Sequence, residues 1–119
     1  MLNLNPSKRT EIPLNLTETG RNEVILLGKV SRVGRLQYTP SGAPIGEVEL
    51  AVPQTHFEKT EVGYFEAVFL GPLAEQWVPR LSIGNFIEIT GKLWSRQFKN
   101  RQGTSVRETK VIVSQAIIK

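Results

Sequence analysis

Residues 86–98, with the sequence FIEITGKLWSRQF, contain the pattern from which the rest of the chain is best interpreted. Side chains alternate across a β-strand, so every second residue faces the same way. One set is apolar or glycine and is predicted to line a core: Ile87, Ile89, Gly91 and Leu93. A shift of one residue would bury Lys92 and Arg96 instead, so the register of this strand is well determined.

The opposite face of this strand is basic and aromatic by turns. It carries Lys92, Trp94, Arg96 and Phe98. Cations neutralise phosphates and exposed rings stack on bases, so these four residues are predicted to bind a nucleic acid. The alternative is that Trp94 and Phe98 cover a hydrophobic edge or a contact between subunits.

Positive charge is concentrated around the same strand. Residues 92–110 hold six basic residues and one acid, whereas the formal net charge of the whole chain is +4. Asn100–Gly103 is predicted to form a hairpin tip, and Lys99, Arg101 and Arg107 lie near it. We expect these three cations to contact the phosphate backbone. A solvated charged loop is the alternative.

The remaining residues predict four more strands and one short helix. The strands are expected at 24–33, 45–52, 64–70 and 104–118, and the helix begins at Pro72 and is interrupted by Pro79. This order predicts an all-β, five-stranded Greek-key OB-fold barrel with one short helix between strands three and four. The loop 34–44 contributes Arg35 and Tyr38 to the expected ligand groove. Residues 22–119 form the domain, and residues 1–21 form an extended or disordered arm.

The composition disfavours an enzyme. The chain has no cysteine, no aspartate and one histidine, His56, so the usual nucleophile systems cannot be assembled. A zinc site would have to use His56 with glutamates alone, which disfavours one. No phosphate-cradling glycine motif is present, and we expect no catalytic residue, metal or cofactor. No apolar run approaches the roughly 20 residues that span a bilayer. The N-terminus lacks the apolar core of a signal peptide, so a cytoplasmic protein with no membrane partner is expected.

From Asn22 to about Ile118 the chain resembles the bacterial single-stranded-DNA-binding protein family. The resemblance is carried by residues 22–28 (NEVILLG), 38–42 (YTPSG), 64–75 (YFEAVFLGPLAE) and 81–98. It implies base stacking at Tyr64 and Phe98, a third aromatic position near His56 and Phe57, and a fourth at Leu70, which is not aromatic. It also implies a homo-oligomer, tetramer or dimer, with Ile25 and Leu27 of the first strand facing out as a possible interface.

Three features depart from the family pattern. The sequence ends at VSQAIIK without the flexible linker and acidic tail of replication members, so a tail-less member is expected. The carboxylates of Glu47, Glu49 and Glu66 are predicted on outward faces, where they would repel phosphates. The leader of about 20 residues is unusual. A dimeric, tail-less relative, the primosomal replication protein of the restart machinery, is the alternative family resemblance.

These observations predict sequence-independent binding of single-stranded DNA in replication, recombination or repair. A replication-restart interaction module, with protein partners and weaker strand binding, is the second hypothesis. RNA binding is the third, because OB-folds accept either type of strand.

Overall fold

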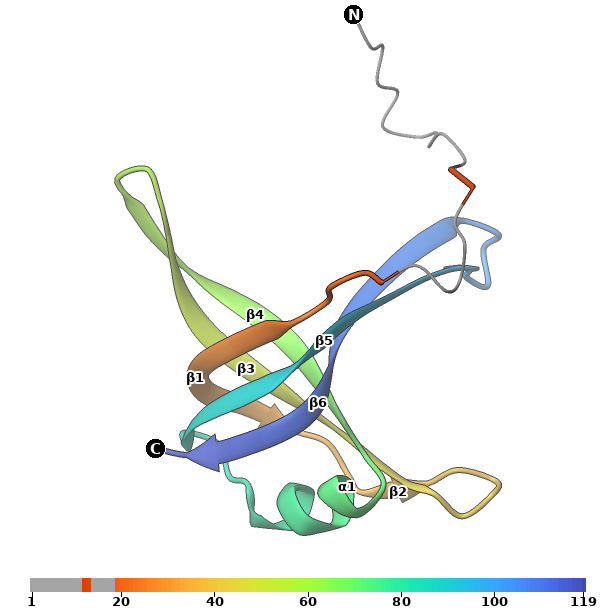
Figure 1. The fold of residues 1–119 in the computed structure, drawn as a ribbon, viewed down its shortest axis with the longest axis horizontal. Helices are drawn as coiled ribbons and strands as arrows, with labels where there is room; N and C mark the ends of the chain where they lie inside the picture. Colours follow the sequence, from red (N-terminus) through yellow and green to blue (C-terminus); the bar gives the residue numbers. More distant parts are fainter. Residues whose placement is uncertain (1–11, 14–18) are drawn as a thin grey trace, which may run out of the picture.

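Five strands close into a barrel, as the sequence predicts (Figure 1). The structure is a computed structural model that describes residues 12–13 and 19–119; most of the predicted N-terminal arm lies outside these ranges. The strands are β1 (Val24–Val33), β2 (Gln37–Tyr38), β3 (Pro44–His56), β4 (Lys59–Leu70), β5 (Phe86–Lys99) and β6 (Ser105–Ile118). Around the barrel the order is β1-β5-β6-β4-β3, and β3 pairs with β1 to complete the circle. The two-residue β2 pairs with the edge of β3.

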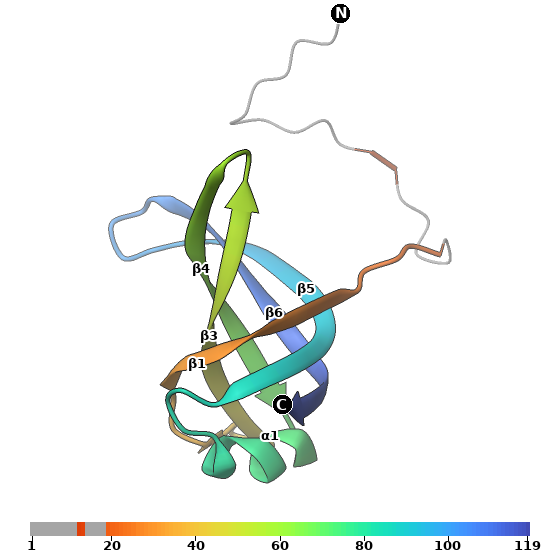
Figure 2. The same ribbon diagram turned by 90° about the vertical axis from the view of Figure 1, so that its left-hand side faces the viewer.

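One end of the barrel is covered by the segment between β4 and β5 (Figure 2). Gly71, at a φ of 64°, turns the chain out of β4, and Pro72 begins α1 (Pro72–Trp77). The α-helix gives way to a 3-10 helix at Val78–Arg80, which contains Pro79. The predicted interruption is therefore confirmed, because proline cannot donate the hydrogen bond that would continue the helix.

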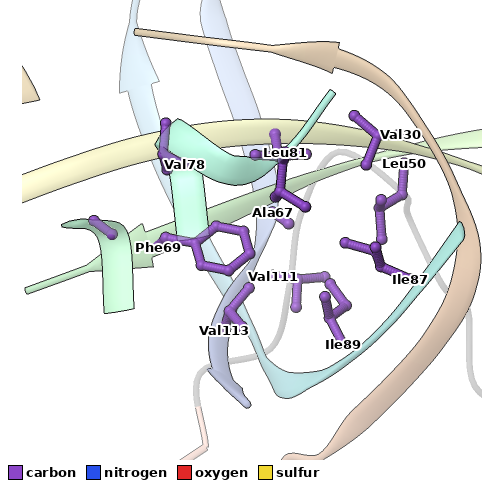
Figure 3. Close-up of a cluster of buried hydrophobic side chains, with 12 residues drawn as sticks. Val30, Leu50, Ala67, Phe69, Val78, Leu81, Ile87, Ile89, Val111 and Val113 are labelled. Atoms are coloured by element: carbon purple, nitrogen blue, oxygen red, sulfur yellow. The ribbon is translucent and has the colours of Figure 1, made fainter. Parts of the chain in front are cut away.

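The barrel encloses one hydrophobic core (Figure 3). Each of the five barrel strands contributes to it, and the buried residues among these are Val30, Val48, Leu50, Ala67, Phe69, Ile87, Ile89, Val111 and Val113. Ala74, Val78 and Leu81 fill the end that α1 covers. The predicted alternation in β3 is confirmed: Val48 and Leu50 are buried, whereas Glu47 and Glu49 lie between them on the outer face.

Two hairpins extend beyond the barrel on the side away from α1 (Figure 1). The hairpin β3–β4 is longer than predicted, because the expected loop between residues 52 and 64 is itself paired strand. Its last pair is His56 with Lys59, which leaves only Phe57 and Glu58 in the turn. The sequence has no glycine here, and Phe57 adopts a φ of 57°, a conformation normally reserved for glycine. The usual sequence signal for a tight hairpin is therefore absent.

The second hairpin, β5–β6, corrects one prediction: Leu93 does not lie in the barrel. It faces the same way as Ile89 and Gly91, but its side chain is 48% exposed. The pairing of β5 with β1 ends at Gly91, so beyond it β6 is the one strand among the described residues that pairs with β5. β6 itself stays paired with β4 through Val111 and Ile112, and from there the two strands continue as an arm. Asn22 is the neighbour there, since its side-chain amide donates to the Leu93 carbonyl at 2.7 Å and accepts from the Leu93 N–H at 2.8 Å.

This difference predicts unequal effects for two similar truncations in β5. Ile89→Ala removes a side chain that is 0% exposed and should lower the free energy of unfolding by about 2–5 kcal/mol. Leu93→Ala removes a half-exposed side chain and should cost less than about 1.5 kcal/mol. Urea denaturation of both variants measures the difference. Equal losses would mean that the arm is packed as tightly as the barrel.

Candidate functional site

The outward face of β5 presents the predicted row of rings and cations. Lys92, Trp94, Arg96 and Phe98 lie on one face, and the two rings are 43% and 38% exposed. The guanidinium carbon of Arg96 lies 5.6 Å from the Trp94 ring centroid and 4.7 Å from that of Phe98. A guanidinium plane between two rings forms a continuous stacking surface.

Arg96 is held in that position by a carboxylate on the neighbouring strand. Its Nε donates to Glu108 Oε2 at 2.8 Å, and Glu108 lies directly opposite Arg96 in the β5–β6 ladder. Hydrogen bonds from Lys110 and Arg96 hold the pKa of Glu108 below its ordinary value. Arg96 therefore contributes a flat surface more than a free positive charge.

The hairpin arm carries cations on both of its faces. Lys99 and Arg107 pair with Ser105 and Gln97, which places them on the face opposite the two rings. Arg101 lies in the tip between β5 and β6. Within residues 12–13 and 19–119, no carboxylate pairs with Lys92, Lys99, Arg101 or Arg107. An extended ligand that contacts the two rings would have to wrap around the arm to reach Lys99 and Arg107 as well.

The other predicted site residues belong to neither β5 nor β6. Tyr64 is 62% exposed on the outer face of β4 and pairs with Ala51 of β3, which in turn pairs with Lys29 of β1 at the rim of the barrel. Beyond this point the hairpin β3–β4 leaves the barrel and diverges from β5–β6 (Figure 1). Tyr38 is exposed on β2 beside Pro44, at the end of the barrel near α1. Arg35 lines a hollow of about 210 Å³ next to Glu47.

Between the two arms, a network of ion pairs crosses the outer face of the barrel. Arg32 of β1 pairs with Glu66, and its Nη2 lies 3.7 Å from Glu49 Oε2. Lys110 Nζ of β6 lies 2.6 Å from Glu47 Oε1 and 2.9 Å from Glu108 Oε1. Glu47, Glu49 and Glu66, which were expected to repel phosphates, are thus partly neutralised. Their ion pairs in turn make Arg32 and Lys110 less available to a phosphate.

Besides Glu108, two groups in this network have shifted pKa values. Burial, together with the neighbouring carboxylates Glu47 and Glu49, raises the pKa of Glu66 against the opposing effect of Arg32. One oxygen, Glu66 Oε2, is buried without a hydrogen-bond partner among the described residues. Burial opposes the charge of Lys110, but hydrogen bonds to Glu47 and Glu108 raise its pKa overall. Glu66 is therefore the least stabilised carboxylate of the network.

The raised pKa of Glu66 predicts a pH-dependent stability. A proton binds Glu66 more tightly in the folded than in the unfolded chain, so stability falls as pH rises from 4.5 through the folded pKa. Glu66→Gln should raise the free energy of unfolding at pH 7 by less than about 1 kcal/mol, with no gain below pH 4.5. Denaturation at several pH values measures this, with Glu61→Gln on the β3–β4 hairpin as the control. A variant less stable than the wild type at pH 7 would show that the Arg32 ion pair dominates.

A groove of about 480 Å³ lies beside the network. Its floor is Val68 and Ile112, which pair directly across β4 and β6. Ile45 and Leu70 form one wall and Trp94 lines the opposite one. Its charged lining residues are Glu47, Lys92, Arg96 and Lys110. The groove therefore combines an aliphatic floor and an aromatic side with charged groups at its edge.

Two kinds of feature are absent from residues 12–13 and 19–119. Among them no three histidine, cysteine, aspartate or glutamate side chains gather as a metal site. No helix in this part of the chain is long and apolar enough to cross a membrane.

Comparison with known proteins agrees with the sequence resemblance. Residues 21–118 match the family model described as the Single-strand binding protein family. The chain belongs to this family. It is 33% identical over 96 residues to the Single-stranded DNA-binding protein of Streptococcus pneumoniae serotype 4 and to Single-stranded DNA-binding protein 2 of Streptococcus pyogenes serotype M18. The alignments cover 76% of this chain, which spans 58–60% of the length of these relatives.

Within the family's fold, sequence reasoning missed two parts of the site. Glu108 and Lys110 were seen only as members of the charged segment, although the alternation in β6 places both on the face of Trp94 and Arg96. The aliphatic groove gave no signal, because Ile45, Val68 and Ile112 belong to three different strands. Leu70, where the resemblance implies a stacking ring, lines this groove opposite Trp94.

Proposed function

We propose that the chain binds single-stranded DNA without requiring a defined sequence, in replication, recombination or repair. The main observation is the ladder of Trp94, Arg96 and Phe98 on an arm that carries four cations unpaired among the described residues. Stacking on rings is tolerant of sequence because every base has a flat face. Membership of the Single-strand binding protein family, whose curated relatives are named for binding single-stranded DNA, supports the same proposal.

A titration with oligo-dT, followed by tryptophan fluorescence, tests this function. Trp94 is expected to be quenched, and the Trp94→Phe variant separates its signal from that of Trp77. The logarithm of affinity should fall with the logarithm of salt concentration, by about 0.7 for each phosphate neutralised. Absence of salt-dependent binding at micromolar protein would refute the proposal. Competition with an RNA strand of matched sequence tests the preference for DNA.

We also propose that the chain assembles as a homo-oligomer, a dimer or tetramer. Ile25 and Leu27 of β1 face outward, as expected. Ile117 of β6 lies on the same outer surface, because Leu27 and Ile117 both pair with Glu88 of β5. Ile25 pairs with Thr90, four residues before Trp94 on the same outward face of β5, so this aliphatic surface lies toward the barrel end of the face that carries the ring ladder. Light scattering in the presence and absence of oligo-dT measures the mass. A monomer under both conditions would refute assembly.

A replication-restart interaction module is the second candidate function. Four carboxylates on the outer face favour it: Glu47, Glu49, Glu66 and Glu108. They form ion pairs with three cations of the same face, Arg32, Arg96 and Lys110. Phosphates must compete with these carboxylates, which would weaken strand binding. The same titration discriminates the two functions, because a protein-binding module would bind oligo-dT only at concentrations well above those of a dedicated binder.

A further inference from the structure

The groove between Trp94 and Leu70 differs from the ring ladder because it combines an apolar floor with a fixed polar pair. Val68 and Ile112 form the floor, and Trp94 lines one side. At the edge of the floor, Lys110 Nζ and Glu47 Oε1 lie 2.6 Å apart. A planar group lying on the floor against the indole would therefore meet one donor and one acceptor side by side.

The polar pair is held in place by its surroundings. Trp94 is directly opposite Lys110 in the β5–β6 ladder, and Glu47 is directly opposite Val68 in β3–β4. Lys110 is 17% exposed and is bonded on a second side by Glu108 at 2.9 Å. Glu47 is 40% exposed, so a ligand in the groove can reach its carboxylate. At this edge of the groove, the Glu47 carboxylate can accept hydrogen bonds from a ligand and the Lys110 ammonium can donate one.

We propose that this groove takes one unpaired base of the bound strand and prefers guanine. The inference rests on the proposed function, to which it adds a single base-selective subsite. Guanine alone carries a carbonyl acceptor next to two adjacent donors, the ring N1–H and the 2-amino group. The Lys110 ammonium would donate to the carbonyl oxygen, while the Glu47 carboxylate would accept from both donors. A carboxylate that accepts two parallel hydrogen bonds is a strong and geometrically specific partner.

The other bases match this edge less completely. Thymine, cytosine and adenine each offer one donor and one neighbouring acceptor, so each can form one bond to Glu47 and one to Lys110. Guanine gains one additional bond, to its 2-amino group. One net hydrogen bond of this kind corresponds to about fivefold tighter binding of guanine than of another base at this position. That difference is small compared with the total binding free energy of a whole DNA strand. Binding would remain tolerant of sequence, with a bias at one position.

The test compares guanine with hypoxanthine, which lacks only the 2-amino group. Short dT strands carry one guanine, or one deoxyinosine, at a central position, and affinities are measured by competition against labelled oligo-dT. The wild type is expected to bind the guanine strand about fivefold more tightly than the deoxyinosine strand. Because the two bases stack alike, this ratio isolates the contact made by the 2-amino group.

Two variants connect the ratio to the groove. Glu47→Gln should reduce the guanine-to-inosine ratio to about one, because a carboxamide oxygen cannot accept both donors in the same geometry. Glu49→Gln is the matched control: it lies on the same face of the same strand, pairs with Arg32 and does not line the groove, so the ratio should persist. Circular dichroism checks that both variants fold.

The possible results separate this inference from the proposed function. Equal affinity of the wild type for the two strands, or a ratio unchanged by Glu47→Gln, would overturn the guanine subsite while leaving single-strand binding intact. Failure to bind any of the strands would overturn the proposed function itself.

Discussion

A protein in which Trp94 and Phe98 are both changed to alanine is expected to bind oligo-dT about a hundredfold more weakly than the wild type. Each ring supplies a stacking surface, and the Arg96 guanidinium lies over both of them. Loss of both rings also leaves Arg96 without its flat neighbours, so the ladder as a whole is removed. Fluorescence anisotropy of a labelled strand measures the affinity without relying on the tryptophan signal.

The double variant should remain folded, since both rings are at least 38% exposed. Phe86→Ala is the matched control, because Phe86 is 40% exposed at the barrel end of the same strand, far along β5 from the ladder. Its affinity should stay within about twofold of the wild type if stacking is confined to the arm. Unchanged affinity per folded molecule in the double variant would show that the rings serve packing or subunit contact instead.

The second large effect is expected from Gly91→Ala. Gly91 lies in β5 where the register with β6 shifts, and a Cβ atom there would stand 2.1 Å from the carbonyl oxygen of Ile112. That oxygen belongs to the backbone and cannot turn aside, so the two strands would have to separate at the base of the arm. The free energy of unfolding should fall by about 3 kcal/mol.

Gly20→Ala provides the comparison for this variant. Among the described residues, and apart from its two chain neighbours, no heavy atom lies within 4 Å of a Cβ built at Gly20, so the stability of this variant should change by less than about 0.5 kcal/mol. Urea unfolding of both variants gives the two values. A loss below about 1 kcal/mol for Gly91→Ala would mean that the β5–β6 ladder relaxes easily at its shifted register.

Much of the barrel could be predicted from local pattern. Alternation in residues 86–98 identified the outward face of β5, and Pro72 and Pro79 marked the beginning and the end of the helix. Alternation says which way a side chain points, however, and not whether another layer covers it. Leu93 was assigned to the core for that reason, although β5 has already left the barrel at that point.

The hairpin β3–β4 was underestimated for a different reason. Its turn places Phe57 at a positive φ, and no short-range sequence signal predicts that conformation for a bulky residue. The strands on either side pair as far as His56 and Lys59, and these contacts hold the turn. Tertiary pairing therefore overrode the local preference.

The ion pairs of the charged residues could not be predicted from the sequence. By itself the sequence determined that rings and cations alternate on one face of β5 and that a barrel of short strands would carry them. Only the tertiary structure decided which cations stay free, because Arg32, Glu47, Glu66 and Lys110 come from four strands that barrel closure brings together. Ion pairs and grooves depend on distances across strands, and those distances are set by how the sheet closes.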